Sequence, residues 1–342
     1  MIDVARHLAD TVLFPDAQHV DRTHVPTSHL DALAAAGLFD LDGLEPSEIR
    51  RVFAAIGGGC GATFFVWVQH HGVVRTLAAS PNEVLRNDLL DDFRTGRRIA
   101  GVAFAHVRRS GPPAISATRI DDGWRLDGHA PWATSWGIAD RFCVAAESLE
   151  GEMVWTMLPG TSGNGLRAET LELPVFAATG TVEFHFDGCA VDDTRVVSVA
   201  DAHAWRAADR RRAALGQPAV LGVAERAIRL LDERGPDAAA TARRLTEQLD
   251  ATWRHDDELG REVAAIPVDA NGVDHDEWIV MASDHRAECL DLARRSTTAL
   301  LAASGGGGMD LGHPAQRLAR EATFYVIQAQ TADGRAATLR RQ

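Results

Sequence analysis

The chain has 342 residues and a hydrophobic fraction of 46%, enough for a sizeable buried core, which excludes an intrinsically disordered chain. Its formal net charge of -13 argues against nucleic acid as a partner, because phosphate binding requires clustered lysine and arginine. The four cysteines are far apart and form no Cys-x-x-Cys pair, which argues against zinc and redox motifs and indicates a reducing cytoplasm. No long apolar run and no signal-peptide pattern is visible, so we expect neither a membrane span nor a signal peptide.

Residues 1–98 have the pattern of a helical domain. Apolar residues recur at three- to four-residue spacing from Leu30 to Phe39, and Pro46 opens a second helical pattern. The glycine cluster at 57–61 lacks the Lys-Ser/Thr of a P-loop, so we expect close helix packing or a helix break there. The stretch 62–71 is apolar nearly all round and predicts a buried central helix with a polar end.

From Ile99 to about Val199 the pattern changes to short β-rich runs. Turn signals such as Gly111-Pro112-Pro113 and Asp122-Gly123 separate them. We expect strands over 99–107, 114–120, 124–126, 141–146, 153–158, 166–173 and 181–186. Runs at this spacing without helical patterns between them indicate an antiparallel barrel or sandwich.

Helical patterns return after about residue 201. The expected features are an apolar helix face at 215–231 ending at 234–236, a helix from about 245, a loop at 267–272, a long helix at 278–301, four glycines at 305–308 and a final helix from about 314 to beyond 339. The chain is therefore predicted to be α+β, with domains at 1–98, 99–199 and 200–342.

Three segments at the joints of this order resemble the acyl-CoA dehydrogenase superfamily. Residues 122–135, which end in Trp132-Ala133-Thr134-Ser135, are similar to the family's "dGy-l-G-k-x-W-I-T-S/N" segment. Residues 186–191 resemble its "F-d-g-v-x-V-P" strand, and residues 305–322 resemble "GG-x-G…P-x-x-R-x-x-R-D-A". The resemblance covers most of the chain. It implies an N-terminal helical domain, a middle antiparallel β-barrel domain and a C-terminal four-helix bundle.

The resemblance also implies a flavin, FAD in the first instance, with its isoalloxazine ring against the β domain. Trp132 would pack beside the ring and Thr134 would hydrogen-bond near its N5, since an indole offers a large rigid face and a hydroxyl both donates and accepts. Tryptophan and threonine are also ordinary strand residues, which is the alternative interpretation. The expected cofactor-binding residues are Phe104, His106, Trp132, Thr134, Ser135, Gly306, Gly307 and Arg317.

Departures from the family's pattern affect the expected chemistry. His106-Val107 replaces the hydroxyl–acid pair of the flavin-contact strand, and Arg234-Gly235-Pro236 stands near the place of an "R-x-x-F-G" segment, so FMN or a reduced flavin becomes an alternative to FAD. Ala329 stands where the segment "Y-E-G-T" places the glutamate base, and alanine cannot remove a proton. The family's other base position falls near Arg212, where Asp209 is the nearest acid.

The missing base points to a related branch with the same fold, the reduced-flavin monooxygenases, which take FMNH2 or FADH2 from a separate reductase. A histidine or serine near the flavin would help this chemistry, because histidine titrates near neutral pH. The catalytic candidates are His70, His106 and Ser135, with His71 beside the first of them. A buried His70 bonded to backbone is the alternative interpretation.

Four histidines in the N-terminal region raise the question of a metal site. His7, His19, His24 and His29 have irregular spacing and no paired acids, so we expect surface histidines. No metal site is expected elsewhere in the chain.

Three functions are open at this point. The chain is a flavin oxidoreductase acting on an acyl thioester or related small molecule, a reduced-flavin monooxygenase working with a reductase, or a non-catalytic subunit of a heteromer with a fuller homologue. The family buries its C-terminal bundle between subunits, so we expect a homodimer or homotetramer. Arg317 and Arg320 would lie at that interface, or would pair with Glu321 or Asp310 on the surface.

Overall fold

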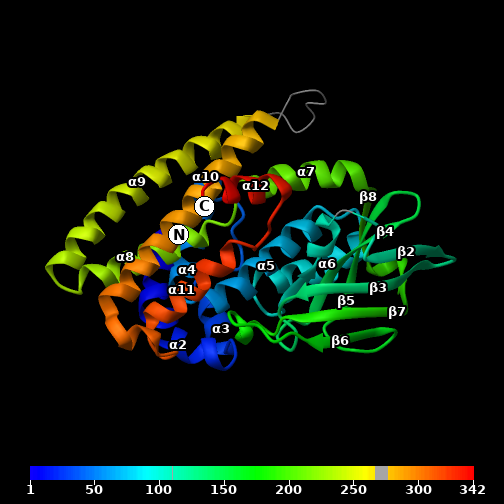
Figure 1. Cartoon of the computed structure of the whole chain (residues 1–342). Helices are drawn as coiled ribbons and strands as arrows, with labels where there is room; N and C mark the ends of the chain where they lie inside the picture. The colour runs from blue at the N-terminus through cyan, green and yellow to red at the C-terminus, as the bar shows by residue number, and fades with distance from the viewer. Residues whose placement is uncertain (110, 266–275) are drawn as a thin grey trace. The chain divides into compact units, whose positions relative to one another are not determined.

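The structure is a computed structural model that describes residues 1–109, 111–265 and 276–342 (Figure 1). The N-terminal helices are α1 (Ile2–Leu8), α2 (Phe14–Arg22), α3 (Thr27–Ala35), α4 (Pro46–Gly59), α5 (Gly61–Ala78) and α6 (Glu83–Arg94). The strands are β1 (Ala100–Ala103), β2 (Ile115–Ile120), β3 (Gly123–Ala133), β4 (Arg141–Ser148), β5 (Glu152–Pro159), β6 (Leu166–Thr170), β7 (Val182–Asp192) and β8 (Val196–Asp201). The C-terminal helices are α7 (Ala202–Ala214), α8 (Ala219–Asp232), α9 (Pro236–Ala265), α10 (Asp276–Ser304), α11 (Pro314–Tyr325) and α12 (Ala332–Arg340).

Two compact units make up the described chain, and each draws on separated stretches of sequence. Unit 1 contains residues 1–22, 42–61 and 209–342, and unit 2 contains residues 23–41 and 62–208. The predicted α+β order of helices, strands and helices is confirmed. The domain boundaries expected from the sequence follow chain order, whereas the units interleave, so those boundaries stay a prediction. The loop expected over 267–272 lies outside the described residues.

Unit 2 is built on one open sheet with the strand order β6-β7-β3-β2-β4-β5-β8, in which β1 pairs with β4. The predicted closed antiparallel barrel is therefore wrong. Closure requires pairing between the two edge strands, and strand spacing in the sequence does not encode that pairing. The sheet is also mixed, since β1 and β2 both run parallel to β4 while the other pairings are antiparallel.

Two helices of unit 2 pack against this sheet. Their shared core consists of Val73, Val74 and Leu77 of α5, Leu85, Leu89 and Phe93 of α6, and Ala100, Val107, Cys143, Ala145, Met153, Trp155, Met157, Val197 and Ala202. The burial predicted for the stretch 62–71 is confirmed, because Phe64, Val66 and Trp67 are fully buried. The Trp67 indole also donates a hydrogen bond to the Leu38 carbonyl at 3.0 Å, which satisfies its one polar atom.

Three local predictions needed correction. The strand expected over 99–107 ends at Ala103, because the backbone at Phe104 leaves the β region and a 3-10 turn follows over Ala105–Arg108. Strand β8 was not predicted. The final helix is broken between Tyr325 and Ala332, and Ala329 in that break has a left-handed φ of 49°.

Among the described helices, none has the length and apolar character needed to cross a membrane.

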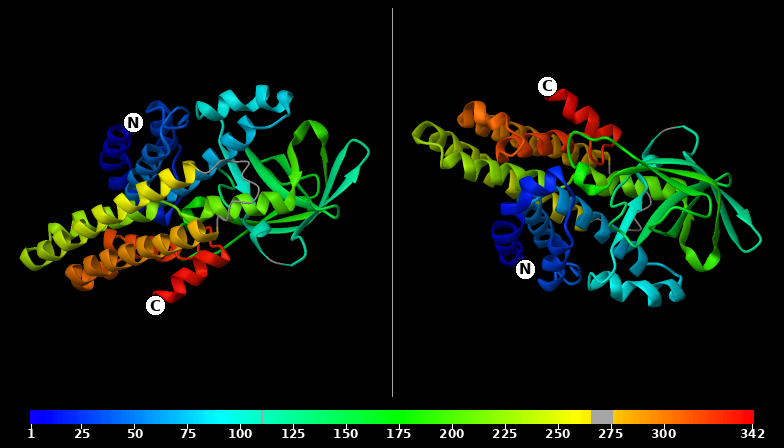
Figure 2. Two further views of the ribbon diagram at one scale, coloured as in Figure 1. Left: turned by 90° about the horizontal axis from the view of Figure 1, so that it is seen from above. Right: turned by 90° about the horizontal axis from the view of Figure 1, so that it is seen from below.

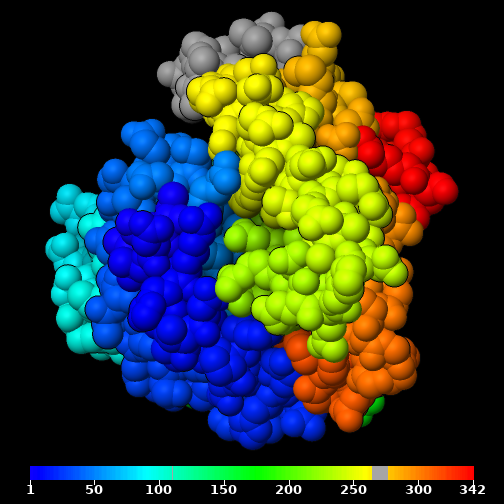
Figure 3. Space-filling view, turned by 90° about the vertical axis from the view of Figure 1, so that its left-hand side faces the viewer, coloured from blue at the N-terminus to red at the C-terminus, as the bar shows by residue number. Residues whose placement is uncertain are grey.

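Unit 1 is held together where α4 crosses α8 at backbone contact. A Cβ at Gly58 would lie 2.5 Å from the Gly222 carbonyl oxygen, and a Cβ at Gly222 would lie 1.8 Å from the Ala54 carbonyl oxygen. Only glycine fits at either position, so the close packing expected of the glycine cluster is confirmed. In Figure 3 the dark blue N-terminal helices lie against yellow-green α8, where Asp10 pairs with Arg226 and Arg229.

Helices α9 and α10 of unit 1 run side by side (Figure 2). A small apolar core closes one end of this pair, and it consists of Ala214, Leu215, Leu259, Trp278, Ile279 and Ala282. The Trp278 indole donates to the Leu259 carbonyl at 3.3 Å, so this core also fixes the register of α10 on α9.

The backbone contact between α4 and α8 at Gly58 and Gly222 predicts that two glycine-to-alanine substitutions change the stability of the protein in opposite directions. Gly222→Ala should lower the free energy of unfolding by about 1–3 kcal/mol or more, because its methyl group overlaps a carbonyl. Gly260→Ala in α9 has nothing within 4 Å of its new Cβ and should raise stability by about 0.5–1 kcal/mol, through helix propensity. Urea unfolding of both variants measures this pair, and equal effects would contradict the crossing.

Candidate functional site

The end of β3 carries an unusual turn that contains three of the expected site residues. Trp132 and Ser135 have left-handed φ values of 69° and 81°, and the pairing of β3 with β7 shifts register between Ala130 and Ala133. Left-handed backbone costs a residue other than glycine about 1–3 kcal/mol. The Trp132 side chain is 41% exposed, whereas Thr134 and Ser135 are buried. Trp132, Thr134 and Ser135 thus share one turn, and their common role as the wall of a flavin site stays a prediction.

Backbone hydrogen bonds hold this turn in its strained shape. The Ser135 amide donates to the Thr179 carbonyl and the Trp136 amide donates to the Gly180 carbonyl, both at 2.9 Å. The Ser135 carbonyl accepts from the amides of Ile138 at 3.0 Å and Ala139 at 2.8 Å. These four hydrogen bonds help to offset the strain at Ser135.

A chain of threonine hydroxyls fixes the direction of the hydrogen bond made by Thr134. The Thr179 hydroxyl donates its only proton to the Phe176 carbonyl at 2.7 Å. Thr181, at 2.9 Å from Thr179, must then donate to it, and Thr134, at 3.1 Å from Thr181, must in turn donate to Thr181. Thr134 is left with lone pairs and no free proton. It can therefore accept a hydrogen bond from a ligand but cannot donate one.

Two further polar atoms near these elements are buried without a hydrogen-bond partner among the described residues. One is the Ser135 hydroxyl oxygen and the other is Nδ1 of His106. Nε2 of His106 donates to the Ala145 carbonyl at 2.8 Å, so the ring is the Nε2–H tautomer and Nδ1 is a bare acceptor. Burial lowers the pKa of His106 to about 4, so the ring is neutral at pH 7. Of the two roles that a histidine can take in such a site, donating or accepting a proton, the Nε2–H tautomer leaves His106 the role of acceptor.

Phe104 is half-buried and packs against the apolar core of unit 2. Its ring centroid is 5.8 Å from that of Trp155 and 6.1 Å from that of Trp205, and the Arg108 guanidinium lies 4.8 Å from its centroid. These contacts are with the core side of the β domain, so the role of Phe104 as a flavin contact stays a prediction. Strand β1, which precedes it, runs close to the turn, because a Cβ at Gly101 would lie 2.9 Å from the Thr134 carbonyl oxygen.

His70 has no ring nitrogen available for chemistry. Its Nε2 donates to the Phe93 carbonyl at 2.9 Å, and its Nδ1 accepts from the Ala100 amide at 3.0 Å. Burial lowers its pKa to about 4, so the neutral ring joins α5, α6 and β1 as a structural residue. His71 is similar, since Nε2 donates to the Leu38 carbonyl at 3.0 Å and burial lowers its pKa to about 3. We therefore no longer place His70 among the catalytic candidates.

The N-terminal histidines differ in exposure. His7, His19 and His24 are exposed, as expected. His29 is buried, and its Nδ1 lies 2.8 Å from the Thr63 hydroxyl, so the surface position expected for it is wrong. A buried polar ring needs such a partner, and Thr63 lies too far away in the sequence to be recognised as one.

Three of the expected cofactor-binding residues belong to unit 1. Gly306 and Gly307 are exposed in a 3-10 turn over Gly305–Met309, and nothing lies within 4 Å of a Cβ at either position. Arg317 is buried and donates to Glu321 at 2.6 Å, so the expected pairing with Glu321 exists, but in the interior. Arg320 pairs with Asp21 instead of Asp310.

The two positions that hold a catalytic base in the resembled family carry no glutamate in unit 1. Ala329 lies in the break between α11 and α12, and its carbonyl accepts from Arg286 at 3.0 Å. Asp209 is buried, with Arg212 at 3.9 Å. Neither alanine nor a buried, paired aspartate is a strong candidate for removing a substrate proton.

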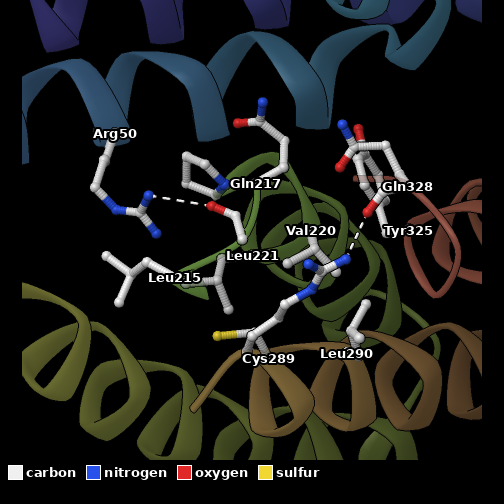
Figure 4. A pocket seen from close by; sticks show the side chains of 12 residues that line it. Arg50, Leu215, Gln217, Val220, Leu221, Cys289, Leu290, Tyr325 and Gln328 are labelled. Carbon is white, nitrogen blue, oxygen red and sulfur yellow. Dashed lines mark hydrogen bonds between the residues drawn. The ribbon is translucent and has the colours of Figure 1, made fainter. Parts of the chain in front are cut away.

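A small hollow in unit 1 lies between α4, α10 and the segment that joins α7 to α8 (Figure 4). Arg50 donates to the Gly216 carbonyl at 3.3 Å across it, and its other walls include Gln217, Cys289 and Tyr325. The hollow leaves a volume of about 10 Å³ in which the centre of a water molecule can lie. It therefore holds about one water. It is too small for a substrate or flavin.

The neutral buried histidines predict acid lability. The folded pKa values of about 4 for His70 and His106 lie below the unfolded value of 6.5, so the unfolded chain binds more protons as the pH falls. Stability present above about pH 6.5 should be lost toward pH 4, by about 2 kcal/mol per histidine at pH 5. His70→Gln should show that much less loss between pH 7 and pH 5 in urea unfolding. The exposed control His203→Gln should follow the wild type, and an unchanged pH dependence in His70→Gln would contradict this assignment.

The strain at Trp132 predicts a difference between two truncations. Both Trp132→Ala and Trp132→Gly remove the indole, but only glycine adopts a φ of 69° without strain. The glycine variant should therefore be more stable than the alanine variant by about 1 kcal/mol in urea unfolding. An alanine variant of equal or greater stability would show that the left-handed turn is not kept in solution.

No protein-family sequence model and no curated protein matches the chain in sequence. Solved structures match its fold over almost its whole length. Butyryl-CoA dehydrogenase from Megasphaera elsdenii has a TM-score of 0.80 at 16% identity, over 99% of this chain and 95% of that chain. Glutaryl-CoA dehydrogenase from Mycobacterium smegmatis, in complex with FADH2, has a TM-score of 0.80 at 18% identity, over 99% and 92%.

A third match has a different activity. FMN-bound TdsC from Paenibacillus sp. A11-2, a dibenzothiophene monooxygenase, has a TM-score of 0.79 at 17% identity, over 98% of this chain and 95% of that chain. Dehydrogenases and a monooxygenase thus share one architecture with this chain, and at these identities the likeness establishes the fold. The chain therefore has the same fold as these acyl-CoA dehydrogenases and TdsC, and its sequence motifs resemble those of the acyl-CoA dehydrogenase superfamily.

Proposed function

We propose that the chain is a flavin-dependent oxidoreductase that binds its flavin ring against the turn at Trp132–Ser135. The observation that carries this proposal is the turn itself, in which a strained backbone carries a half-exposed indole and a buried hydroxyl without a hydrogen-bond partner among the described residues. Backbone strain and unsatisfied buried polar atoms gather at ligand sites, because a ligand supplies the missing contacts. The residues present therefore fit a flat ligand with hydrogen-bonding edges.

The hydroxyl chain supports a preference for the reduced flavin. A flavin accepts a hydride in its oxidised form and activates oxygen in its reduced form. N5 of the oxidised ring only accepts hydrogen bonds, whereas the reduced ring carries N5–H and donates one. Thr134 has lone pairs but no free proton, so it complements the reduced ring.

The missing base supports monooxygenation as the mode of action. Alpha-proton removal from an acyl thioester needs a carboxylate, and unit 1 has Ala329 and the buried Asp209 at the two positions considered. We therefore propose a reduced-flavin monooxygenase that acts on a small molecule and receives FMNH2 or FADH2 from a separate reductase. His106 Nδ1 and the Ser135 hydroxyl are the groups that would hold or accept a proton from the substrate.

The proposal includes a cytoplasmic location and a homo-oligomeric state. All four cysteines are buried and, among the described residues, none forms a disulfide, which supports a reducing, cytoplasmic location; the fold supports a homodimer or homotetramer. Dehydrogenation of an acyl thioester is the second candidate, and the matches to butyryl-CoA and glutaryl-CoA dehydrogenases favour it. A non-catalytic subunit is the third, and the absence of a base at Ala329 favours it.

Anaerobic titration with reduced and oxidised FMN and FAD tests flavin binding and its preference. We expect the reduced form to bind at least tenfold more tightly, because only its N5–H finds an acceptor in Thr134. Thr179→Val frees the proton of Thr181 to point toward Thr134, which lets Thr134 donate, so this variant should lose most of the preference. Trp132→Gly should weaken both forms while remaining folded. No binding of any flavin would reject the proposal.

Two assays then separate the modes of action. With a reductase, NADH, oxygen and a panel of aromatic substrates, a monooxygenase should consume oxygen and form a hydroxylated or sulfoxidised product. Addition of acyl-CoA thioesters to flavin-loaded protein without oxygen should bleach the flavin only if the chain is a dehydrogenase. Flavin binding without either reaction, together with co-purification of a homologous chain, would identify a non-catalytic subunit.

A further inference from the structure

Three side chains from α9 and α10 of unit 1 converge on the side of this helix pair. They are His255 of α9 with His285 and Glu288 of α10, and one ligand atom of each lies within 4.8 Å of the other two. Both His255 Nδ1 and His285 Nδ1 lie 3.8 Å from the Glu288 carboxylate oxygen Oε2. The two imidazole rings are 4.6 Å apart at their centroids.

His285 is held so that one nitrogen faces this cluster without a hydrogen-bond partner among the described residues, with the Glu288 carboxylate 3.8 Å away. Its side chain is fully buried, and Nε2 lies 3.3 Å from the Asp256 carboxylate and 3.5 Å from the Cys289 sulfur. Nδ1 is buried and has no hydrogen-bond partner among the described residues. A buried polar atom in that condition calls for an explanation, and a bound ion is one.

The arrangement around His285 is the one that metal sites use to orient a histidine ligand. In such sites the histidine binds the ion through one nitrogen and donates the N–H of the other to a carboxylate, which fixes the ring and its tautomer. Asp256 is the carboxylate here, and it is itself held by Arg50 at 2.6 and 2.7 Å. The ring is thus oriented by a rigid, buried pair of charges before any ion binds.

We propose that His255, His285 and Glu288 bind a divalent transition-metal ion of the Zn²⁺ class and thereby cross-link α9 and α10. Two imidazole nitrogens and one carboxylate oxygen suit Zn²⁺ and its neighbours, and the ion replaces the proton on Nδ1 of His285. Metal–ligand bonds of about 2.0–2.2 Å require the ligand atoms to approach to roughly 3.3 Å, less than the present separations. The side chains of His255 and Glu288 are 45% and 44% exposed, so they can move the short distance required.

The neighbouring charges are compatible with this site. Arg341 donates to Oε1 of Glu288 at 2.8 Å, which leaves Oε2 for the ion and steadies the carboxylate. Cys289 lies against Nε2 of His285, on the ring edge away from the ion, so it should not become a ligand. With three protein ligands, the remaining coordination position would be taken by water. This site is independent of the proposed flavin chemistry.

Binding of Zn²⁺ and Co²⁺ to the chelator-treated, flavin-free full chain tests the proposal. Calorimetry should find one Zn²⁺ per chain and a rise in the thermal unfolding midpoint. Co²⁺ should give visible d–d absorption without the intense near-ultraviolet thiolate band that Cys289 would produce as a ligand. His255→Ala and Glu288→Gln alter exposed ligands, should leave the apo fold intact, and should each weaken Zn²⁺ binding at least tenfold.

Two control variants make the result specific. His203→Ala and Glu258→Gln change exposed residues of the same types on α7 and α9, and they should bind Zn²⁺ like the wild type. Wild-type affinity in both ligand variants, no binding to the wild-type chain, or a thiolate band with Co²⁺ would each overturn the proposed site. Because the protein is free of flavin, these outcomes are separate from the success or failure of the flavin titrations.

Discussion

A buried carboxylate, that of Asp256, constrains how three helices of unit 1 can pack. Its side chain has no exposed surface, and a buried charge is tolerated only with paired, well-directed partners. Arg50 of α4 provides two hydrogen bonds and His285 of α10 provides a third, so α4, α9 and α10 are tied at one point. Burial alone raises the pKa of Asp256, but His285 and Arg50 lower it to about 2, so the group stays charged. Removal of either partner would leave an uncompensated buried charge and would therefore be strongly destabilising.

In unit 2 the comparable constraint is the backbone conformation of one turn. The turn after β3 keeps Trp132 and Ser135 in left-handed conformations, and the carbonyls of Thr179 and Gly180 hold it. The same segment starts the threonine hydroxyl chain that orients Thr134. Shape and hydrogen-bond polarity at this wall thus come from one short stretch of the chain, which makes the wall rigid in both respects.

The sequence predicted what local pattern controls and missed what distant contacts control. Helix and strand periodicity, the glycine packing at 57–59 and the segment 132–135 all follow from neighbouring residues, and their placement in the structure agrees with the motif order. Barrel closure failed because edge pairing is a long-range property. The bonding of His70 depends on carbonyl and amide groups of Phe93 and Ala100, and no residue type signals that. The tie between Arg50 and Asp256 joins positions 206 residues apart, so no spacing rule reveals it.

The interleaved units have a consequence for synthesis of the protein. Unit 1 begins with residues 1–22 and 42–61 but is completed only by residues 209–342, so its first helices emerge from the ribosome long before their partners. Gly58 of α4 is synthesised roughly ten seconds or more before Gly222 of α8, against which it packs, because translation proceeds at about 5–20 residues per second. Unit 2 ends at residue 208, so all of its residues are synthesised before unit 1 is complete. The face of α4 that packs on α8 therefore has no partner until α8 has been synthesised.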